Sequence, residues 1–214
     1  MELTQSRLRL ALSQHFDERL TPEVCAHIEA IVFDSSDRSI RTDQFEPMEF
    51  RGYVIAVESF KAALIELHEL HERHWHETEK HRAGLPFNPN YAEFLRMERA
   101  GKLVQFTIRK GGALVGNLRM WLGVSLHTGT YFADTKPGAE EDTLYIAPEH
   151  RGHFLLPLTL LRYAERVLIS LGMVEIRADS KALNRADVLL RRMGYQLVAY
   201  KFVKIFVGDE YGKD

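Results

Sequence analysis

A change of hydrophobic period at Gly101 constrains the fold more than any other feature of the sequence. Before it, apolar residues recur at spacings of three and four, and the longest such stretch, residues 57–82, predicts a helix facing a core. After it, residues 103–108 and 113–123 flank the turn Lys110-Gly111-Gly112 and predict a β-hairpin. The chain therefore combines helices with a sheet.

The remaining elements continue this alternation. Asn90 caps a short predicted helix to Ala100, and the polar stretch 127–142 is rich in turn residues. The predicted elements that follow are a strand at 143–146, a helix to about residue 171, a strand at 174–178, a helix at 184–193 and a closing strand at 195–207. Strands alternating with helices indicate an α/β fold with a mixed sheet.

Residues 1–50 are polar and mostly helical in pattern. Thr21, followed by Pro22 in the first turn, predicts a capped helix to about Phe33. We expect a small helical extension at 1–50 and one larger domain at 51–208.

Composition limits the classes of partner. The formal net charge of -2 gives no global basic field that would attract nucleic acid, although a local patch leaves such a partner open. The single cysteine, Cys25, cannot form an intrachain disulfide. With no apolar run long enough to span a bilayer and no signal-peptide pattern, we expect a cytoplasmic protein without a membrane partner.

One segment carries a recognisable chemistry. The predicted strand ends at Ala147-Pro148, turns through Glu149–Gly152 and opens a long helix. Unpaired N–H groups at a helix start, together with the positive end of the helix dipole, form an anion site. Gly152 lets the backbone approach a diphosphate, and Arg151 adds a cation beside it.

The turn is followed by the long helix, the next strand, and then Asn184-Arg185-Ala186 and Met193-Gly194-Tyr195 with six residues between them. Together these features resemble the GNAT superfamily of N-acetyltransferases. The resemblance implies the GNAT acyl-CoA N-acyltransferase fold, with acetyl-CoA as co-substrate and no metal. It places the pantetheine along the strand before the turn, facing Leu144, Tyr145 and Ile146. It places the pyrophosphate on Arg151, Gly152 and His153, with Asn184 beside the cofactor.

The acceptor side follows from the same resemblance, because the long helix at 57–82 borders the substrate cleft in GNAT domains. His74 and Trp75 are therefore expected to line the acceptor entrance. The several histidines of this helix could indicate a metal site, but the glutamates interleaved among them favour a salt-bridged, solvent-facing surface.

Proton transfer requires other groups. Leu190 occupies the position, four residues before Gly194, from which a family tyrosine protonates the thiolate, which leaves Tyr163, Tyr195 and Tyr200 as replacements. For the base we predict His127, whose imidazole titrates near neutrality, acting with Glu141 or Asp142.

The sequence also departs from the family pattern, because Glu149 stands where Gln or Arg is usual and Phe154 where a small residue is usual. The favoured function is acetyl transfer from acetyl-CoA to an amine by direct attack in a ternary complex. The acceptor is a small molecule or a protein amine, and a homodimer is possible. The alternatives are a GNAT-like binding or regulatory protein without catalysis, and a related transferase that uses another acyl donor or a nucleobase amine.

Overall fold

The computed structural model describes residues 19, 21, 24, 38–79, 82, 85–125, 137–152, 155–180 and 186–200. The chain divides into two compact units, Met1–Arg38 and Ser39–Asp214. In the first unit, the helical Val24 donates its N–H to Thr21 Oγ1 at 3.3 Å, as expected of a helix capped by Thr21. The second unit begins before the boundary that we predict between residues 50 and 51.

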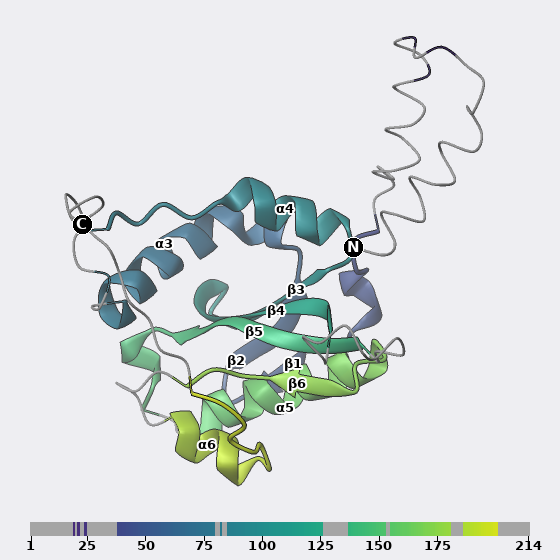
Figure 1. Ribbon diagram of the computed structural model, residues 1–214. Helices are drawn as coiled ribbons and strands as arrows, with labels where there is room; N and C mark the ends of the chain where they lie inside the picture. The colour runs from purple at the N-terminus through teal and green to yellow at the C-terminus, as the bar shows by residue number, and fades with distance from the viewer. Residues whose placement is uncertain are drawn as a thin grey trace, which may run out of the picture. The chain divides into compact units, whose positions relative to one another are not determined.

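Within the described residues of the second unit, six strands form one mixed sheet, in the order β1-β2-β3-β4-β5-β6 (Figure 1). Neighbouring strands are antiparallel from β1 to β5, and β5 and β6 are parallel. The strands are β1 (Met48–Phe50), β2 (Tyr53–Glu58), β3 (Leu103–Lys110), β4 (Ala113–Ser125), β5 (Pro137–Ile146) and β6 (Glu175–Arg177).

Helices cover both faces of this sheet (Figure 1). The helices α3 (Phe60–Thr78) and α4 (Tyr91–Arg99) lie on one face. The helices α5 (Leu155–Ser170) and α6 (Ala186–Arg192) lie on the other. Among the residues described, no helix combines the length and the apolar character needed to cross a membrane.

Several elements match the sequence predictions. The hairpin β3–β4 turns at Gly111 and Gly112, whose φ angles of 57° and 86° suit glycine. The helix α4 begins after Asn90, whose side chain accepts a hydrogen bond from the Glu93 N–H at 3.2 Å. Pro157 lies in the first turn of α5, where its missing N–H costs no helical hydrogen bond.

Strand β2 was not predicted, and the predicted start of the following helix at residue 57 is wrong. Tyr53, Ile55 and Val57 are buried and alternate with less buried residues, which is the period of a strand. Because α3 starts only two residues after β2 ends, the two hydrophobic periods run together in the sequence. The short edge strand β1 was also not predicted, since its three residues are too few to show a period.

The structure changes two further predictions. Residues 137–142, predicted as turns, extend β5, and residues 137–141 pair with β4 through their backbones, which their side chains do not reveal. Residues 195–200, the described part of the predicted closing strand, form no strand. Leu197 and Val198 are exposed there, so no buried apolar face stabilises an extended segment.

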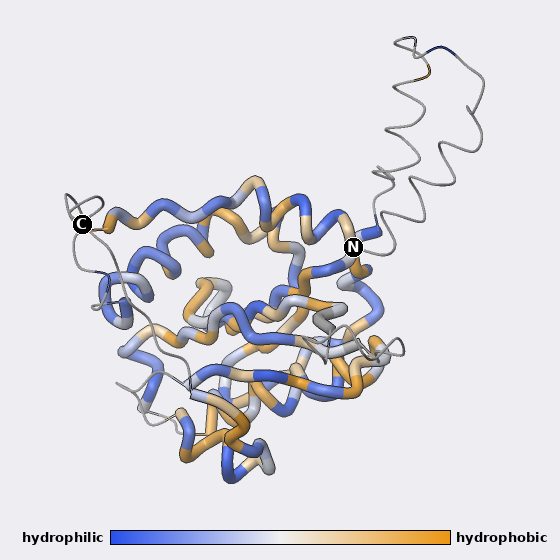
Figure 2. The backbone as a smooth tube through the Cα atoms, viewed as in Figure 1, coloured by the Kyte–Doolittle hydropathy of each residue, from blue (hydrophilic) through white to orange (hydrophobic). Residues whose placement is uncertain are grey.

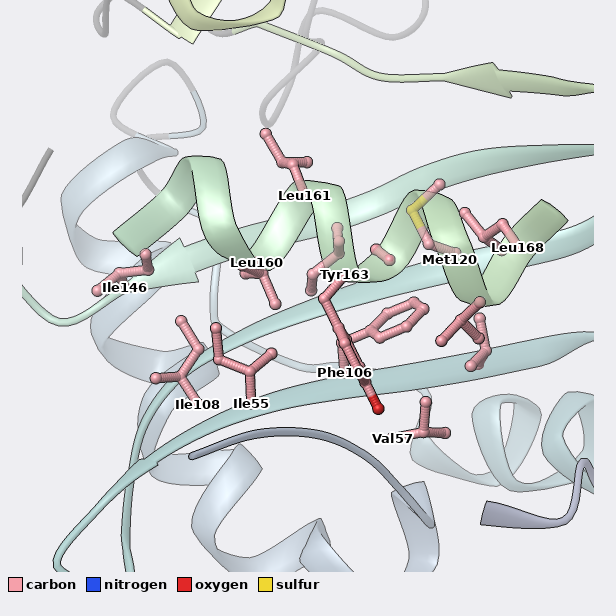
Figure 3. Close-up of a cluster of buried hydrophobic side chains, with 14 of the residues drawn as sticks. Ile55, Val57, Phe106, Ile108, Met120, Ile146, Leu160, Leu161, Tyr163 and Leu168 are labelled. Atoms are coloured by element: carbon pink, nitrogen blue, oxygen red, sulfur yellow. The ribbon is translucent and has the colours of Figure 1, made fainter. Parts of the chain in front are cut away.

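The larger core lies between the sheet and α5 (Figure 3). Phe106 and Ile108 of β3 point toward Leu160 and Tyr163 of α5 (Figure 3), and all four side chains are at least 96% buried. Full burial of such a side chain contributes about 1.5–3 kcal/mol. This face therefore supplies most of the apolar stabilisation of the unit.

The opposite face of the sheet is more polar. Among the described residues, five of its buried side chains are polar or charged, namely Gln105, Thr107, Asn117, Arg119 and Thr143. They lie beneath α3, whose C-terminal half is hydrophilic (Figure 2). Buried polar groups need hydrogen-bond partners, and this requirement shapes the candidate site described next.

Candidate functional site

The pairing between β5 and β6 ends partway along β5, because β6 ends at Arg177. Their parallel pairing covers only Gly138–Glu140 on β5, opposite Glu175–Arg177 on β6. Strand β5 continues to Ile146, and within the described residues no strand pairs with this edge beyond Glu140. A strand edge with no strand partner among the described residues offers backbone donors and acceptors to an extended ligand.

A small cavity lies where this pairing ends. It encloses about 10 Å³, room for about one water, and is lined by residues that include Glu141, Glu165, Ile176 and Tyr195. Burial, and then the nearby Glu165 carboxylate, raise the pKa of Tyr195 above its usual value. The phenol therefore keeps its proton at neutral pH.

The three tyrosines considered as replacement acids lie in different surroundings. The Tyr163 hydroxyl donates to the Glu46 carbonyl at 3.1 Å, while its ring packs in the core. Tyr200 is 76% exposed. Tyr195 therefore lies closest to the end of the pairing between β5 and β6. Leu190, at the position of the family tyrosine, is a buried core residue.

The turn that follows β5 is the 3₁₀ helix η3 (Pro148–His150), and it leads through Arg151 and Gly152 toward α5. A Cβ atom added at Gly152 would have no other atom within 4 Å. The φ angle of Gly152 also lies outside the left-handed region. Neither packing nor backbone conformation thus requires glycine here, whereas the close approach of a ligand would.

Both charged residues of this turn bind α3. The guanidinium of Arg151 pairs with the carboxylate of Glu77, and its Nε donates to the Ile146 carbonyl at 2.6 Å. Glu149 accepts two hydrogen bonds from Arg73, at 3.0 and 2.8 Å. The charges of the turn are therefore balanced by side chains from α3.

Glu141 and Asp142, predicted as alternative partners of the base, lie on opposite faces of the sheet. A register shift in the β4–β5 pairing makes Asp142 the extra residue of a bulge. Its carboxylate accepts from Arg119 Nη2 at 2.5 Å and from Trp121 Nε1 at 3.1 Å, on the α3 side. Glu141 lines the cavity on the α5 side.

The three strand residues expected to face pantetheine alternate between the two faces of the sheet. Leu144 and Ile146 pack on the core that α5 covers. Tyr145 lies on the α3 side, where its ring stacks on that of His74, with 4.8 Å between centroids. Contact between pantetheine and this strand would therefore involve its exposed backbone edge, together with side chains from both faces.

His74 and Trp75, predicted at the acceptor entrance, diverge from each other. His74 Nδ1 lies 2.9 Å from Thr143 Oγ1, directly over β5. Trp75 packs instead against Phe87, with 6.1 Å between ring centroids, and against the Arg82 guanidinium. His74 is thus the nearer of the two to the open edge of β5.

A buried polar cluster, which was not predicted, lies between α3, α4 and the sheet. His71 lies 3.2 Å from Asn117 Nδ2, 3.4 Å from Arg119 Nη1 and 3.3 Å from the Tyr91 hydroxyl. Burial, then the charge of Arg119, lower the pKa of His71 to about 3, while burial raises the pKa of Tyr91 to about 12.

A sequence signal for this cluster does exist. Asn117, Arg119 and Trp121 alternate with the apolar Leu118 and Met120 along one predicted strand. That alternation indicates a strand with one polar face. In the described part of the chain, no three metal-binding side chains converge. His127, His153 and Asn184, predicted as base and cofactor residues, lie outside the described residues.

Comparisons with known proteins bear on the fold. No family model matches the chain, and no curated protein matches its sequence. Among similar solved structures, the aminoglycoside N-acetyltransferase AAC(6')-Iy, in complex with a CoA bisubstrate analogue, is 16% identical. Its TM-score is 0.55, over 72% of this chain and 98% of that chain.

Two other structures agree with this result. A ribosomal-protein-alanine N-acetyltransferase from Brucella melitensis has a TM-score of 0.51 at 13% identity, over 73% of this chain and 99% of that chain. An acetyltransferase from Trypanosoma brucei has a TM-score of 0.53 at 16% identity, over 72% and 99%. The chain has the fold of the GNAT superfamily, as its sequence motifs predict.

Proposed function

We propose that this chain is an N-acetyltransferase that binds acetyl-CoA along the open edge of β5 and transfers the acetyl group to an amine. The main support for this proposal is that the pairing of β5 with β6 ends at Glu140. From there to the turn at Pro148–Gly152, β5 has no strand partner on this side among the described residues. An open strand edge beside a glycine turn and a helix start suits a ligand with an extended amide arm and a diphosphate.

The residues of the turn fit such a ligand. The space around Gly152 admits an approaching diphosphate, and Arg151 and Arg73 supply cations within the same region. When bound, acetyl-CoA supplies an activated thioester. The chain would bind it through the β5 backbone and the turn, while His74 and Thr143, which contact each other over β5, would face the acceptor.

The central test is the affinity for acetyl-CoA, measured by calorimetry. Gly152→Glu places a carboxylate on the path of the diphosphate and should weaken binding by at least about 100-fold, or roughly 2.7 kcal/mol. Gly152→Ala is the matched control, because the open space around Gly152 accepts a methyl group. It should keep the fold and lose far less affinity than Gly152→Glu, because the added methyl group is small and uncharged. Equal binding by the two variants would contradict the placement of the diphosphate.

For proton transfer we propose His127 as the base. An ammonium acceptor cannot attack until it loses a proton, and the Asp142 carboxylate is already held by Arg119 and Trp121. His127→Ala should lower turnover by roughly 10²–10⁴-fold and leave acetyl-CoA affinity unchanged. The assay would use a panel of aminoglycosides and N-terminal alanine peptides, the acceptor types of the structural neighbours. Wild-type turnover by the variant would remove His127 from the mechanism.

A second candidate function is a GNAT-like protein that does not transfer an acetyl group. Leu190, buried in the core at the position of the family tyrosine, favours it. Such a protein could still bind acetyl-CoA, but it would leave every amine in the panel unmodified. The two candidates are therefore distinguished by turnover and not by binding.

A further inference from the structure

Two ion pairs join the C-terminal half of α3 to the turn after β5. Glu77 pairs with Arg151, and Arg73 pairs with Glu149 across a distance of 2.8 Å. Within this group of four, two cations face two carboxylates, so their formal charges cancel. A diphosphate that approaches the turn therefore meets cations that are already neutralised.

The contacts of Arg151 show which carboxylate is the direct competitor. Its Nε donates to the Ile146 carbonyl, while both terminal nitrogens donate to Glu77. A guanidinium binds a phosphate through the same paired donors that it offers to a carboxylate. The bidentate contact with Glu77 and a bidentate contact with a diphosphate thus exclude each other.

We propose that Glu77 competes with the CoA diphosphate for Arg151 and so sets the affinity of the site for CoA. This inference rests on the proposed function. It identifies Glu77 as a residue of α3 that tunes cofactor affinity from outside the turn itself.

The exchange of partners is feasible because Glu77 does not lose every contact. The Tyr145 hydroxyl donates to Glu77 Oε2 at 3.1 Å, so the carboxylate keeps a hydrogen bond when Arg151 turns away. The pair is also partly exposed, with 41% of the Arg151 side chain and 36% of the Glu77 side chain accessible. Ion pairs at this exposure are weak and exchange easily.

The test compares acetyl-CoA affinity in matched variants of the full chain by calorimetry. Glu77→Gln should tighten binding by about 3- to 10-fold, because it removes one competing charge next to a diphosphate. Glu66→Gln is the control. Glu66 also lies on α3 and also pairs with an arginine, Arg109, at 2.8 Å, but this arginine belongs to β3 and not to the turn. The acetyl-CoA affinity of Glu66→Gln should differ from that of the wild type by less than about 2-fold.

A double-mutant cycle then assigns the effect to Arg151. In an Arg151→Gln background, the gain from Glu77→Gln should be clearly smaller than in the wild type, because the carboxylate no longer competes for Arg151. Glu77→Ala should reproduce the gain, which covers the case in which glutamine keeps a hydrogen bond to Arg151.

The outcomes separate this inference from the proposed function. If the wild type binds acetyl-CoA and neither Glu77 variant binds more tightly, the inference is wrong and the proposed function stands. Equal gains from Glu77→Gln and Glu66→Gln would reduce the effect to net charge and would also overturn the inference. If neither the wild type nor either Glu77 variant binds, the inference and the proposed function both fall.

Discussion

At the scale of single residues, the buried polar side chains between α3 and the sheet are the least expected feature. The Arg119 side chain is only 6% exposed, and its guanidinium lies 4.0 Å from the ring centroid of Phe94. Its charge is offset by Asp142, and its Nη1 also lies within hydrogen-bond distance of His71. Since a guanidinium can only donate, the facing His71 nitrogen must accept, and the imidazole must be neutral.

This arrangement predicts how stability depends on pH. The pKa of His71 falls to about 3, chiefly through burial, whereas in the unfolded chain it returns to about 6.5. As pH falls below about 6.5, the unfolded state binds a proton that the folded state does not, so stability decreases. The loss attributable to His71 is about 1.4 kcal/mol per pH unit, or about 2 kcal/mol between pH 6.5 and 5.

Urea unfolding between about pH 5 and 7 checks this prediction. His71→Gln offers Asn117 an acceptor but does not titrate, so its stability should fall less steeply than that of the wild type over this range. His76→Gln removes an exposed histidine of the same helix and serves as the control, with no change of slope. If the free energy of unfolding falls equally steeply with decreasing pH in the wild type and in His71→Gln, then His71 takes up its proton in the folded state as well.

At the scale of elements, α3 connects most parts of the candidate site. Its N-terminus is capped twice, by Ser59, which accepts from Ala62 N at 3.3 Å, and by Glu98 of α4, which accepts from Phe60 N at 2.5 Å. A carboxylate at this end also interacts favourably with the helix dipole. The helix is thus fixed at its start by α4 and at its end by the turn after β5, which it reaches through Arg73 and Glu77.

The elements that sequence reasoning missed have separate physical causes. The apolar run of β2 is followed at once by the apolar face of α3, so a window of residues contains both periods. The polar start of β5 is held by backbone pairing with β4, which leaves no side-chain pattern. Conversely, the apolar residues 195–200 resemble a strand in sequence, but packing does not bury Leu197 or Val198.

At the scale of the whole molecule, the motif at Pro148–Gly152 predicts the fold together with the strand–helix unit that follows it and Met193-Gly194-Tyr195. A turn of this kind between a strand and a long helix, followed by a second strand–helix unit, specifies element order. The contacts of the turn could not be predicted in the same way. Arg73 and Glu77 lie more than 70 positions from Glu149 and Arg151, and only the packing of α3 on the sheet brings them together.

The division of the chain after Arg38 leads to the last prediction, which concerns the independence of the larger unit. Every residue of the three hydrophobic clusters in the described part of the chain lies after that point, from Ile40 onward. The turn, the unpaired part of β5 and α3 also belong to this unit.

A fragment Ser39–Asp214 should therefore fold and keep the acetyl-CoA affinity of the full chain within about 2-fold, a difference of roughly 0.4 kcal/mol. Its melting temperature should differ by less than about 4 °C, since 1 kcal/mol corresponds to about 2–4 °C in a chain of this size. Calorimetry and thermal unfolding of the purified fragment provide the measurement. A fragment that stays unfolded, or that folds but no longer binds, would show that residues 1–38 complete the domain or its site.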